Sequence, residues 1–498
     1  MSKTTHYGIQ TLGALHNSGW KSRPIQQELR ENLIRFISEG KSGFEGIYGY
    51  ENTVIPELER AILSGHHICL LGLRGQAKTR LARQMIHFLD EWMPYLKGSE
   101  LLDDPFFPLS AFGKKLVEDL GDMAPIAWMH RSERFTEKLA TPDVSVADLI
   151  GDVDPIKAAA LKLSYSNEQV IHYGLIPRSN RCIFVLNELP DLQARIQVSL
   201  FNILQEGDIQ IRGFKLRLPL DIQFVFTANP EDYTNRGSIV TPLKDRIDSQ
   251  ILTHYPAKLE DGKRITSQEA RIRPGQAGIQ VPELARDLIE QIAIEARKSE
   301  FIDARSGVSA RMTISAFENL VSATELRMLK NAETEGSIRL TDFLGVVPAI
   351  TGKVELVYEG EQEGAGIVAL NLIGKAIRTL FLQHFPDPES FRKQKQASIY
   401  EPVIQYFGDG NVLTLKAMDT QEEYQRSLEL VPGLNDLVFD AGAHVESRHF
   451  LFWKEFVLFG LAECSQISKQ NLGLETRFGD LLGSMLDLEN LDFGEEEE

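Results

Sequence analysis

The sequence feature that most constrains the fold is an apolar run, residues 68–71, that leads into a glycine-bearing loop and a Lys-Thr pair. The loop consists of Gly72, Leu73, Arg74, Gly75, Gln76, Ala77, Lys78 and Thr79. Apolar residues then recur with helical spacing, at Leu81, Met85, Phe88, Leu89 and Trp92. A buried strand, a loop with glycines and a helix, in this order, predict a phosphate-binding loop.

The residue types of this loop suit the binding of a nucleotide phosphate. Glycines allow backbone N–H groups to surround the phosphate oxygens, and the start of the helix adds partial positive charge. Lys78 is expected to reach the terminal phosphates, and the Thr79 hydroxyl is expected to bind Mg²⁺. Ala77 stands where the usual pattern has a glycine. The alternative is a loop that only connects a strand with a helix, but the Lys-Thr pair in register favours phosphate binding.

Length and composition limit the class of protein. A chain of 498 residues has room for two or three domains, and 43% apolar with 25% charged residues is ordinary for a globular protein. The formal net charge of −18 argues against a surface that binds nucleic acid non-specifically. Three scattered cysteines and an N-terminus without an apolar core favour a cytoplasmic protein. The apolar residues 450–461 are too few to span a membrane.

The first half of the chain alternates apolar runs with helical patterns. Residues 1–22 show no clear period and are expected to form a mobile arm. Buried strands are expected at 68–71, 125–129, 182–186, 222–228 and 250–254. An insertion of hairpins and short helices is expected at 143–178, and a hairpin at 208–218, where apolar residues alternate about Gly213. Buried strands that alternate with helices predict an α/β fold with a parallel five-stranded sheet covered on both faces.

The second half of the chain is predominantly helical. Amphipathic patterns after Pro256 cover residues 281–298, 309–330 and 364–384, and a Pro-Asp-Pro sequence at 386–388 suggests a boundary. We therefore expect a flexible arm at 1–22, an α/β nucleotide-binding domain at 23–256, a helical domain at 257–386 and a C-terminal extension at 387–498. The acidic residues 495–498 are expected to be solvated, and the role of the extension is open.

Polar residues follow the predicted third and fourth strands. Ligands of such sheets bind at the carboxyl ends of the strands, so Asn187, Glu188 and Asn229 are expected near the loop. Glu188 is placed to polarise the water that attacks the terminal phosphate, and Asn229 to orient that water or the phosphate. An aspartate that supports Mg²⁺ is usual where Asn187 stands. The amide offers an oxygen without charge, which predicts weaker Mg²⁺ retention or slower hydrolysis.

Two arginines are candidates for stabilising charge on a transferred phosphate. Arg246 precedes the last predicted strand, where a neighbouring subunit's nucleotide could lie, and Arg311 begins a helix of the second domain. The alternative for each is a surface salt bridge.

His66 and His67 are adjacent on a strand and point to opposite faces, so they cannot chelate one ion. The metal ligands expected from the sequence are therefore Thr79, Asn187 and Glu188, all at the nucleotide.

Taken together, these motifs resemble the AAA+ ATPases, and within them the group of the magnesium chelatase ATPase subunit and MoxR. The resemblance rests on the loop, on Asn187-Glu188, on Asn229 and on the Leu-Lys-Asp-Arg sequence that ends at Arg246. Ala77 is the residue that loops of the MoxR type usually carry, and the segments 148–178 and 208–218 resemble two hairpin insertions of that group. The resemblance covers residues 20–385, whereas the last hundred or so resemble nothing recognised.

The resemblance implies a hexameric ring with ATP and Mg²⁺ at the subunit interfaces and a helical lid at 257–386. Ile47, Tyr48 and Gly49 would line the adenine pocket. Asn229 would be the first sensor residue, Arg246 an arginine finger acting on the neighbouring subunit, and Arg311 the second sensor residue. Such ATPases commonly act with a separate von Willebrand A-type protein.

The function expected from the sequence is an ATP-hydrolysing motor that remodels a partner protein or a metal-insertion complex. A transcriptional regulator or nucleic-acid-associated ATPase is one alternative, although no Gly-Ala-Phe-Thr-Gly-Ala loop or helix-turn-helix is evident and the net charge is unfavourable. A nucleotide-gated scaffold with little hydrolysis is another. Magnesium insertion into porphyrin is a narrower activity that the sequence alone does not support.

Overall fold

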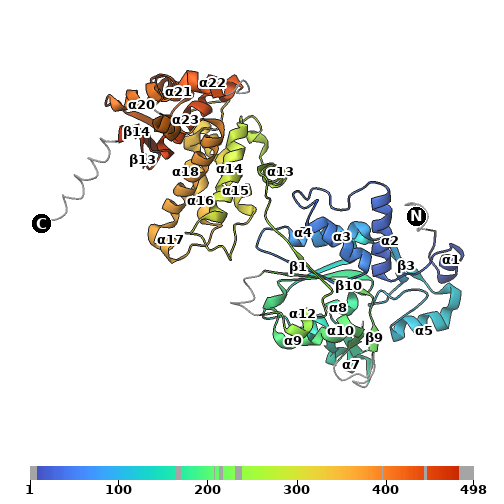
Figure 1. The fold of residues 1–498 in the computed structure, drawn as a ribbon. Helices are drawn as coiled ribbons and strands as arrows, with labels where there is room; N and C mark the ends of the chain where they lie inside the picture. Colours follow the sequence, from blue (N-terminus) through green and yellow to red (C-terminus); the bar gives the residue numbers. More distant parts are fainter. Residues whose placement is uncertain are drawn as a thin grey trace. The chain divides into compact units, whose positions relative to one another are not determined.

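The chain folds into two units, each with a hydrophobic core of its own. They are Met1–Tyr255 and Pro256–Glu498 (Figure 1). The computed structural model describes residues 8–163, 170–206, 208–211, 217–229, 238–394, 396–441 and 446–481. The division between the units follows the last strand of the main sheet directly, so the candidate loop and the polar strand ends belong to one unit.

The first unit is built on a five-stranded sheet in which every neighbouring pair is parallel. Its order across the sheet is β11 (Ser249–Leu252), β1 (Ile68–Leu71), β10 (Ile222–Ala228), β7 (Cys182–Asn187) and β4 (Phe135–Leu139). The first strand in sequence is therefore an interior strand, between the last strand and the fourth. This arrangement confirms the predicted α/β fold with a parallel five-stranded sheet.

Side chains alternate between the two faces of the sheet, and each face is buried under helices. Leu70 packs into a core with α2 (Ile25–Ser38), α3 (Val54–Ser64) and α4 (Lys78–Gln84). Its neighbour Cys69 belongs to the opposite core, with α8 (Leu175–Arg178), α9 (Ala194–Ser199), α10 (Phe201–Glu206) and α12 (Thr241–Lys244). The two groups of helices lie on opposite sides of the sheet (Figure 1). Successive side chains of a strand point to opposite faces. Because both faces of this sheet are buried, its interior strands are continuously apolar.

One predicted strand lies outside the main sheet. The apolar residues 125–129 form β3 (Ile126–His130), which pairs antiparallel with β2 (Trp92–Leu96) in a separate ribbon. The second strand of the main sheet is instead β4, whose sequence is Phe-Thr-Glu-Lys-Leu. β4 is an edge strand and is only partly buried, so it lacks the apolar run that identifies a central strand. Trp92, expected on the helix after the loop, begins β2, because α4 and the following η1 (Met85–Phe88) end before it.

The described part of the expected N-terminal arm, residues 8–22, is folded against this ribbon. Thr11 forms a β-bridge with Pro125 and accepts a hydrogen bond as the N-cap of α1 (Leu12–Asn17). Leu15 is fully buried in a small core with Leu96 and Ile126, and α5 (Ala111–Leu120) packs on the same core. The expectation of a mobile arm is therefore wrong for residues 8–22, because these apolar side chains have a surface to bury against. Residues 1–7 lie outside the described part.

Two insertions carry short antiparallel pairs. The first contains α6 (Val146–Leu149), then β5 (Gly151–Val153), α7 (Pro155–Leu161) and β6 (Ile171–Tyr173), with β5 paired to β6. In the second, β8 (Asp208–Gln210) pairs with β9 (Arg217–Pro219). This pairing lies where alternation predicted a hairpin, although its tip at 212–216 and Gly213 are outside the described residues.

The second unit is mainly helical and ends with a small antiparallel sheet. Its helices are α13 (Leu259–Glu269), α14 (Glu283–Lys298), α15 (Arg311–Lys330), α16 (Val347–Thr351), α17 (Tyr358–Glu363), α18 (Ala365–His384), α19 (Pro388–Gln394), α20 (Glu401–Gly408), α21 (Gln421–Glu429), α22 (Leu434–Ala441) and α23 (Phe450–Glu463). The sheet has the order β12 (Leu413–Lys416), β14 (Glu475–Gly479) and β13 (Ser468–Leu472).

The structure does not divide this unit at residue 386. A single apolar cluster extends from Ile279 to Phe478, across the expected boundary. Polar contacts cross it too, because the buried Glu455 of α23 accepts hydrogen bonds from the backbone N–H groups of Leu340 and Thr341. The helical region and the C-terminal extension therefore share one core, because the apolar side chains of each are buried against those of the other.

One helix among the described residues, α18, is long and apolar enough to cross a membrane. Half of its apolar window is buried inside the protein, and eight of its side chains belong to the core of the second unit. Its apolar composition is accounted for by its position between α14 and α23.

Candidate functional site

The predicted phosphate-binding loop connects the interior strand β1 with helix α4, which begins at Lys78. Two of its residues have left-handed backbone, Gly75 with φ 73° and Ala77 with φ 56°. Gly72 is required by space, since a Cβ there would lie 2.0 Å from the hydroxyl oxygen of Thr253. Ala77 does not have the freedom of glycine, so its conformation costs about 1–2 kcal/mol.

Side chains from outside the loop hold this conformation. The Tyr50 hydroxyl donates to the carbonyl oxygens of Gln76, at 3.0 Å, and His254, at 2.7 Å. Thr253 donates to Oε1 of Gln76 at 2.7 Å, and the Tyr255 hydroxyl donates to the carbonyl oxygen of Arg74 at 2.9 Å. Burial raises the pKa of Tyr50 to about 12, so its hydroxyl stays a donor. The sequence reasoning missed these residues, although Thr253 and Tyr255 directly follow the last strand.

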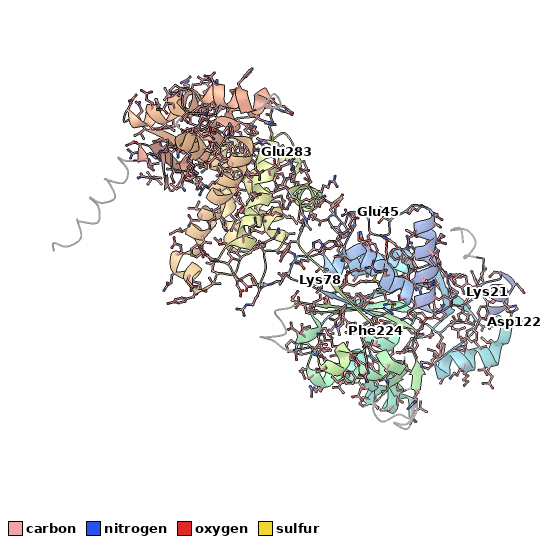
Figure 2. The ribbon with its side chains drawn as sticks, viewed as in Figure 1. Lys21, Glu45, Lys78, Asp122, Phe224 and Glu283 are labelled. Atoms are coloured by element: carbon pink, nitrogen blue, oxygen red, sulfur yellow. The ribbon has the colours of Figure 1, made fainter. Side chains whose placement is uncertain are left out.

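Lys78 links the loop to the end of the neighbouring strand β10. Its ammonium donates to Oδ1 of Asn229 at 2.6 Å, to the carbonyl oxygen of Leu73 at 3.0 Å, and to that of Gly72. Lys78 lies at the edge of the sheet, whereas Phe224 of β10 lies within it (Figure 2). The structure thus brings together a lysine and an amide that the sequence separates by 151 positions.

A polar cluster lies beside the start of α4, at the end of β7. Asn187 is 8% exposed, and its Oδ1 accepts hydrogen bonds from the hydroxyls of Thr79, at 3.4 Å, and Thr227, at 3.0 Å. Its Nδ2 donates to Oε1 of Glu137 at 2.6 Å. Arg83 of α4 holds the other oxygen of Glu137, with Nη2 at 2.7 Å. The sequence reasoning missed Glu137 because its strand was not recognised.

The donor atoms in this cluster fit Mg²⁺ accompanying a nucleotide. The hydroxyl of Thr79 and the amide oxygen of Asn187 are hard oxygen ligands, and Mg²⁺ is usually held by one or two protein oxygens, nucleotide phosphates and water. The part of the chain that the structure describes contains no group of three or more His, Cys, Asp and Glu able to hold a metal on its own. The arrangement therefore suits an ion that arrives with a phosphate ligand.

Glu188 directly follows this cluster in an unusual backbone conformation. It has φ 54° and ψ 50°, between β7 and the short turn η5 (Leu189–Asp191), and its N–H donates to the Thr227 hydroxyl at 3.1 Å. Left-handed backbone in a residue other than glycine costs about 1–3 kcal/mol and is concentrated at functional sites. The partly exposed carboxylate is at the same edge of the sheet as Lys78 and Asn229.

The residues expected to line an adenine pocket lie in the connection between α2 and α3. Ile47 is buried in the core beneath this connection, and Gly49 has a left-handed φ of 80°. Tyr48 is partly exposed. The next residue, Tyr50, contacts Gln76, so this segment adjoins the loop. Adenine binding by these residues remains a prediction.

The two candidate arginines are placed differently. Arg246 follows α12, and its guanidinium contacts Oε1 of Gln205, at 2.9 and 2.8 Å, the carbonyl oxygen of Pro242, and the ring of Phe201. Within the chain it therefore sits on α10. Arg311 is the exposed first residue of α15, in the second unit. The roles proposed for both arginines remain predictions.

No family model matches the sequence, and no curated protein matches it either. Solved structures are similar at low identity, among them NtrX from Brucella abortus, with 14% identity over 62% of this chain and a TM-score of 0.33. This chain spans only 56% of that NtrX chain. A model of the BchI–BchD complex of magnesium chelatase has 17% identity, a TM-score of 0.33, and coverage of 64% of this chain and 98% of that one. Hsp104 from S. cerevisiae, in complex with ADP, has 13% identity, a TM-score of 0.35, and coverage of 65% and 53%.

The geometry of the first unit itself indicates its fold. A loop of the phosphate-binding type follows the interior strand β1, which has the last strand of the sheet on one side and the fourth on the other. Polar residues follow or end the third and fourth strands. Helices cover both faces of this parallel sheet. The first unit of the chain therefore has a parallel α/β fold with helices on both faces, consistent with the AAA+ core that the sequence resembles.

Proposed function

We propose that this chain binds ATP with Mg²⁺ at residues 72–79 and hydrolyses it as an AAA+ motor of the magnesium chelatase and MoxR type. The observation that carries this proposal is the contact between Lys78 and Asn229, because it places a cation of the loop against the polar end of the adjacent strand. Loop, lysine and strand end are the parts that phosphoryl transfer needs for positioning and charge stabilisation.

Each residue has a role that follows from its position. Lys78 leaves the loop carbonyls and Asn229 to neutralise the terminal phosphate, and Asn229 then orients the attacking water. Glu188 accepts a proton from that water. Thr79 and Asn187 are the residues that would hold Mg²⁺, which neutralises charge on the phosphates when bound.

Assembly and partner are part of the same proposal. A homohexameric ring supplies Arg246 of one subunit to the nucleotide of the next, and Arg311 keeps the role of second sensor residue that the resemblance implies. The paired strands β5–β6 and β8–β9 contact the remodelled protein, and a von Willebrand A-type protein is the expected partner. A cytoplasmic location is consistent with three buried, unpaired cysteines.

A steady-state ATPase assay at varied Mg²⁺ tests the proposal, with Lys78→Ala as the blank. We expect Mg²⁺-dependent turnover that Lys78→Ala and Glu188→Gln abolish. ATP binding without turnover in the assembled ring would contradict the motor and support the second candidate, a nucleotide-gated scaffold. That candidate is favoured by the neutral Asn187 beside the metal position. Tight, salt-sensitive binding to DNA in a fluorescence-anisotropy titration would instead support a nucleic-acid-associated ATPase.

A further inference from the structure

The Glu137 carboxylate of the edge strand β4 contacts Asn187, the residue that departs most from the chemistry expected of the site. Glu137 lies in the middle of β4, and its Oε1 accepts a hydrogen bond from Asn187 Nδ2 at 2.6 Å. A carboxylate can only accept hydrogen bonds, so Glu137 selects the amide nitrogen of Asn187. The amide oxygen is thereby directed to the hydroxyls of Thr79 and Thr227.

The position of this carboxylate is itself well determined. The Arg83 Nε and Nη2 atoms lie 3.0 and 2.7 Å from Glu137 Oε2, so Arg83 occupies one carboxylate oxygen and leaves Oε1 for Asn187. The side chain of Glu137 is 23% exposed, and Asn187 is buried. A hydrogen bond to a charged acceptor is stronger than a hydrogen bond between neutral groups. The bond between Asn187 and Glu137 is also less screened by water than a bond at an open surface.

We propose that Glu137 is a positioning residue for Mg²⁺, which provides through Asn187 the negative charge that an aspartate at position 187 would place directly beside the ion. The Glu137 carboxylate polarises the amide and holds its oxygen on the side of Thr79. Partners that orient a metal ligand in this way typically change metal affinity by about 10- to 100-fold. This role rests on the proposed function, because the ion is expected to arrive with ATP.

The arrangement predicts what happens when the charge is moved. Asn187→Asp alone puts a second carboxylate at hydrogen-bond distance from Glu137, where both cannot stay ionised at low cost. Glu137→Gln alone keeps an oxygen that can accept from Asn187 but removes the charge. In the double variant the new glutamine amide donates to the new aspartate, so the hydrogen bond and one negative charge are both retained, with their positions exchanged.

The experiment measures ATP binding by the full-length protein with Mg²⁺ and with EDTA, by calorimetry. The readout is the metal enhancement, defined as Kd in EDTA divided by Kd in Mg²⁺. We expect Glu137→Gln to reduce this ratio about tenfold while Kd in EDTA changes less than about twofold. Asn187→Asp alone is expected not to raise the ratio. The double variant is expected to return to within about threefold of wild type. Glu133→Gln, an exposed glutamate near β4, is the matched control and should leave the ratio unchanged.

The outcomes separate this inference from the proposed function. A wild-type protein that binds no ATP in either buffer contradicts the proposed function. ATP binding with an unchanged metal enhancement in Glu137→Gln contradicts only the role of Glu137. If Glu137→Gln does not fold, the double variant decides, because it retains both the bond and the charge. A metal enhancement near the wild-type value then supports the role, and its loss overturns it.

Discussion

The Nζ atom of Lys78 lies 2.6 Å from Oδ1 of Asn229, so a hydrogen bond joins the phosphate-binding loop to the end of β10. This contact keeps the lysine in the region where the terminal phosphate is expected, while the carbonyl oxygens of Gly72 and Leu73 supply its other acceptors. ATP must replace these acceptors with phosphate oxygens. Asn229 is then free to contact the attacking water.

Replacing Asn229 by alanine should separate binding from chemistry. We expect Asn229→Ala to bind ATP within about threefold of wild type, because the loop carbonyls still hold Lys78. Turnover should fall about 100-fold, the usual effect of losing one side chain that orients the reacting groups. Steady-state kinetics and calorimetry measure the two effects. Asn229→Asp is a useful second variant, since its charge should retain Lys78 and weaken ATP binding. Unchanged turnover in Asn229→Ala would rule out a sensor role.

Adding one methyl group to Gly72 should weaken nucleotide binding. A Cβ at this position would lie 2.0 Å from Thr253 Oγ1, so the loop or the end of β11 must shift. We expect Gly72→Ala to raise Kd for ATP more than tenfold. Ala77→Gly is the matched control. It relieves left-handed backbone at Ala77 but adds chain entropy to the unfolded state, so stability should change by less than about 1 kcal/mol. Equal ATP affinity of the two variants would contradict this account of the loop.

Removing one hydroxyl should loosen the loop without changing its sequence. Tyr50→Phe loses the hydrogen bonds to the carbonyl oxygens of Gln76 and His254. The two carbonyl oxygens share one hydroxyl proton. A buried acceptor left without its donor costs about 1–3 kcal/mol, of which water recovers a part. We expect a lower melting temperature and a several-fold higher Kd for ATP. Tyr358→Phe, at an exposed position of the second unit, should change neither quantity. Hydrogen exchange across residues 72–79 would show whether the loop has become more open.

Mixing two inactive variants should test whether Arg246 acts on a neighbouring subunit. Glu188→Gln lacks the proton acceptor, and Arg246→Ala lacks the arginine, so each alone should be inactive. In a mixed ring, a site with Glu188 can meet an Arg246 from the next subunit, at about a quarter of the interfaces of a random equal mixture. ATPase activity should therefore reappear on mixing. No recovery in a mixture shown to form joint rings would place Arg246 in its own subunit's site or outside any site.

A buried carboxyl of the second unit should make stability depend on pH. Burial raises the pKa of Glu290 to about 6, while the Thr266 hydroxyl donates to its Oε1. The folded protein therefore holds this proton more tightly than the unfolded chain. The stabilisation is complete below about pH 4.5 and is lost as pH rises through about 6.

The matched variant for this effect is Glu290→Gln, which keeps an acceptor for Thr266 but does not titrate. Its stability relative to wild type should rise between pH 5 and pH 8, by at most on the order of 2 kcal/mol. Hydrogen exchange of α14, which carries Glu290, measures this difference at several pH values. A difference between the proteins that is constant from pH 5 to pH 8 would show that Glu290 titrates normally.

The sequence by itself determined the elements whose signal is local. The strand at 68–71, the loop, and the strands ending at Asn187 and Asn229 were all identified, because buried central strands need continuous apolar runs and the loop needs glycine and Lys-Thr together. Their meeting at one edge of the sheet follows from parallel strands, whose carboxyl ends lie on the same side. The parallel sheet could therefore be predicted before any contact was known.

Only the tertiary structure decided which polar residues complete the site. Glu137 lies on an edge strand, where partial exposure permits a polar sequence and removes the apolar signal. Tyr50 and Thr253 reach the loop from 26 and 177 positions away, and spacing along the chain carries no information about such contacts. For the same reason, the sequence did not predict the core that residues 257–386 share with the C-terminal region. Burial depends on which apolar surfaces meet in space, and local sequence shows only that such surfaces exist.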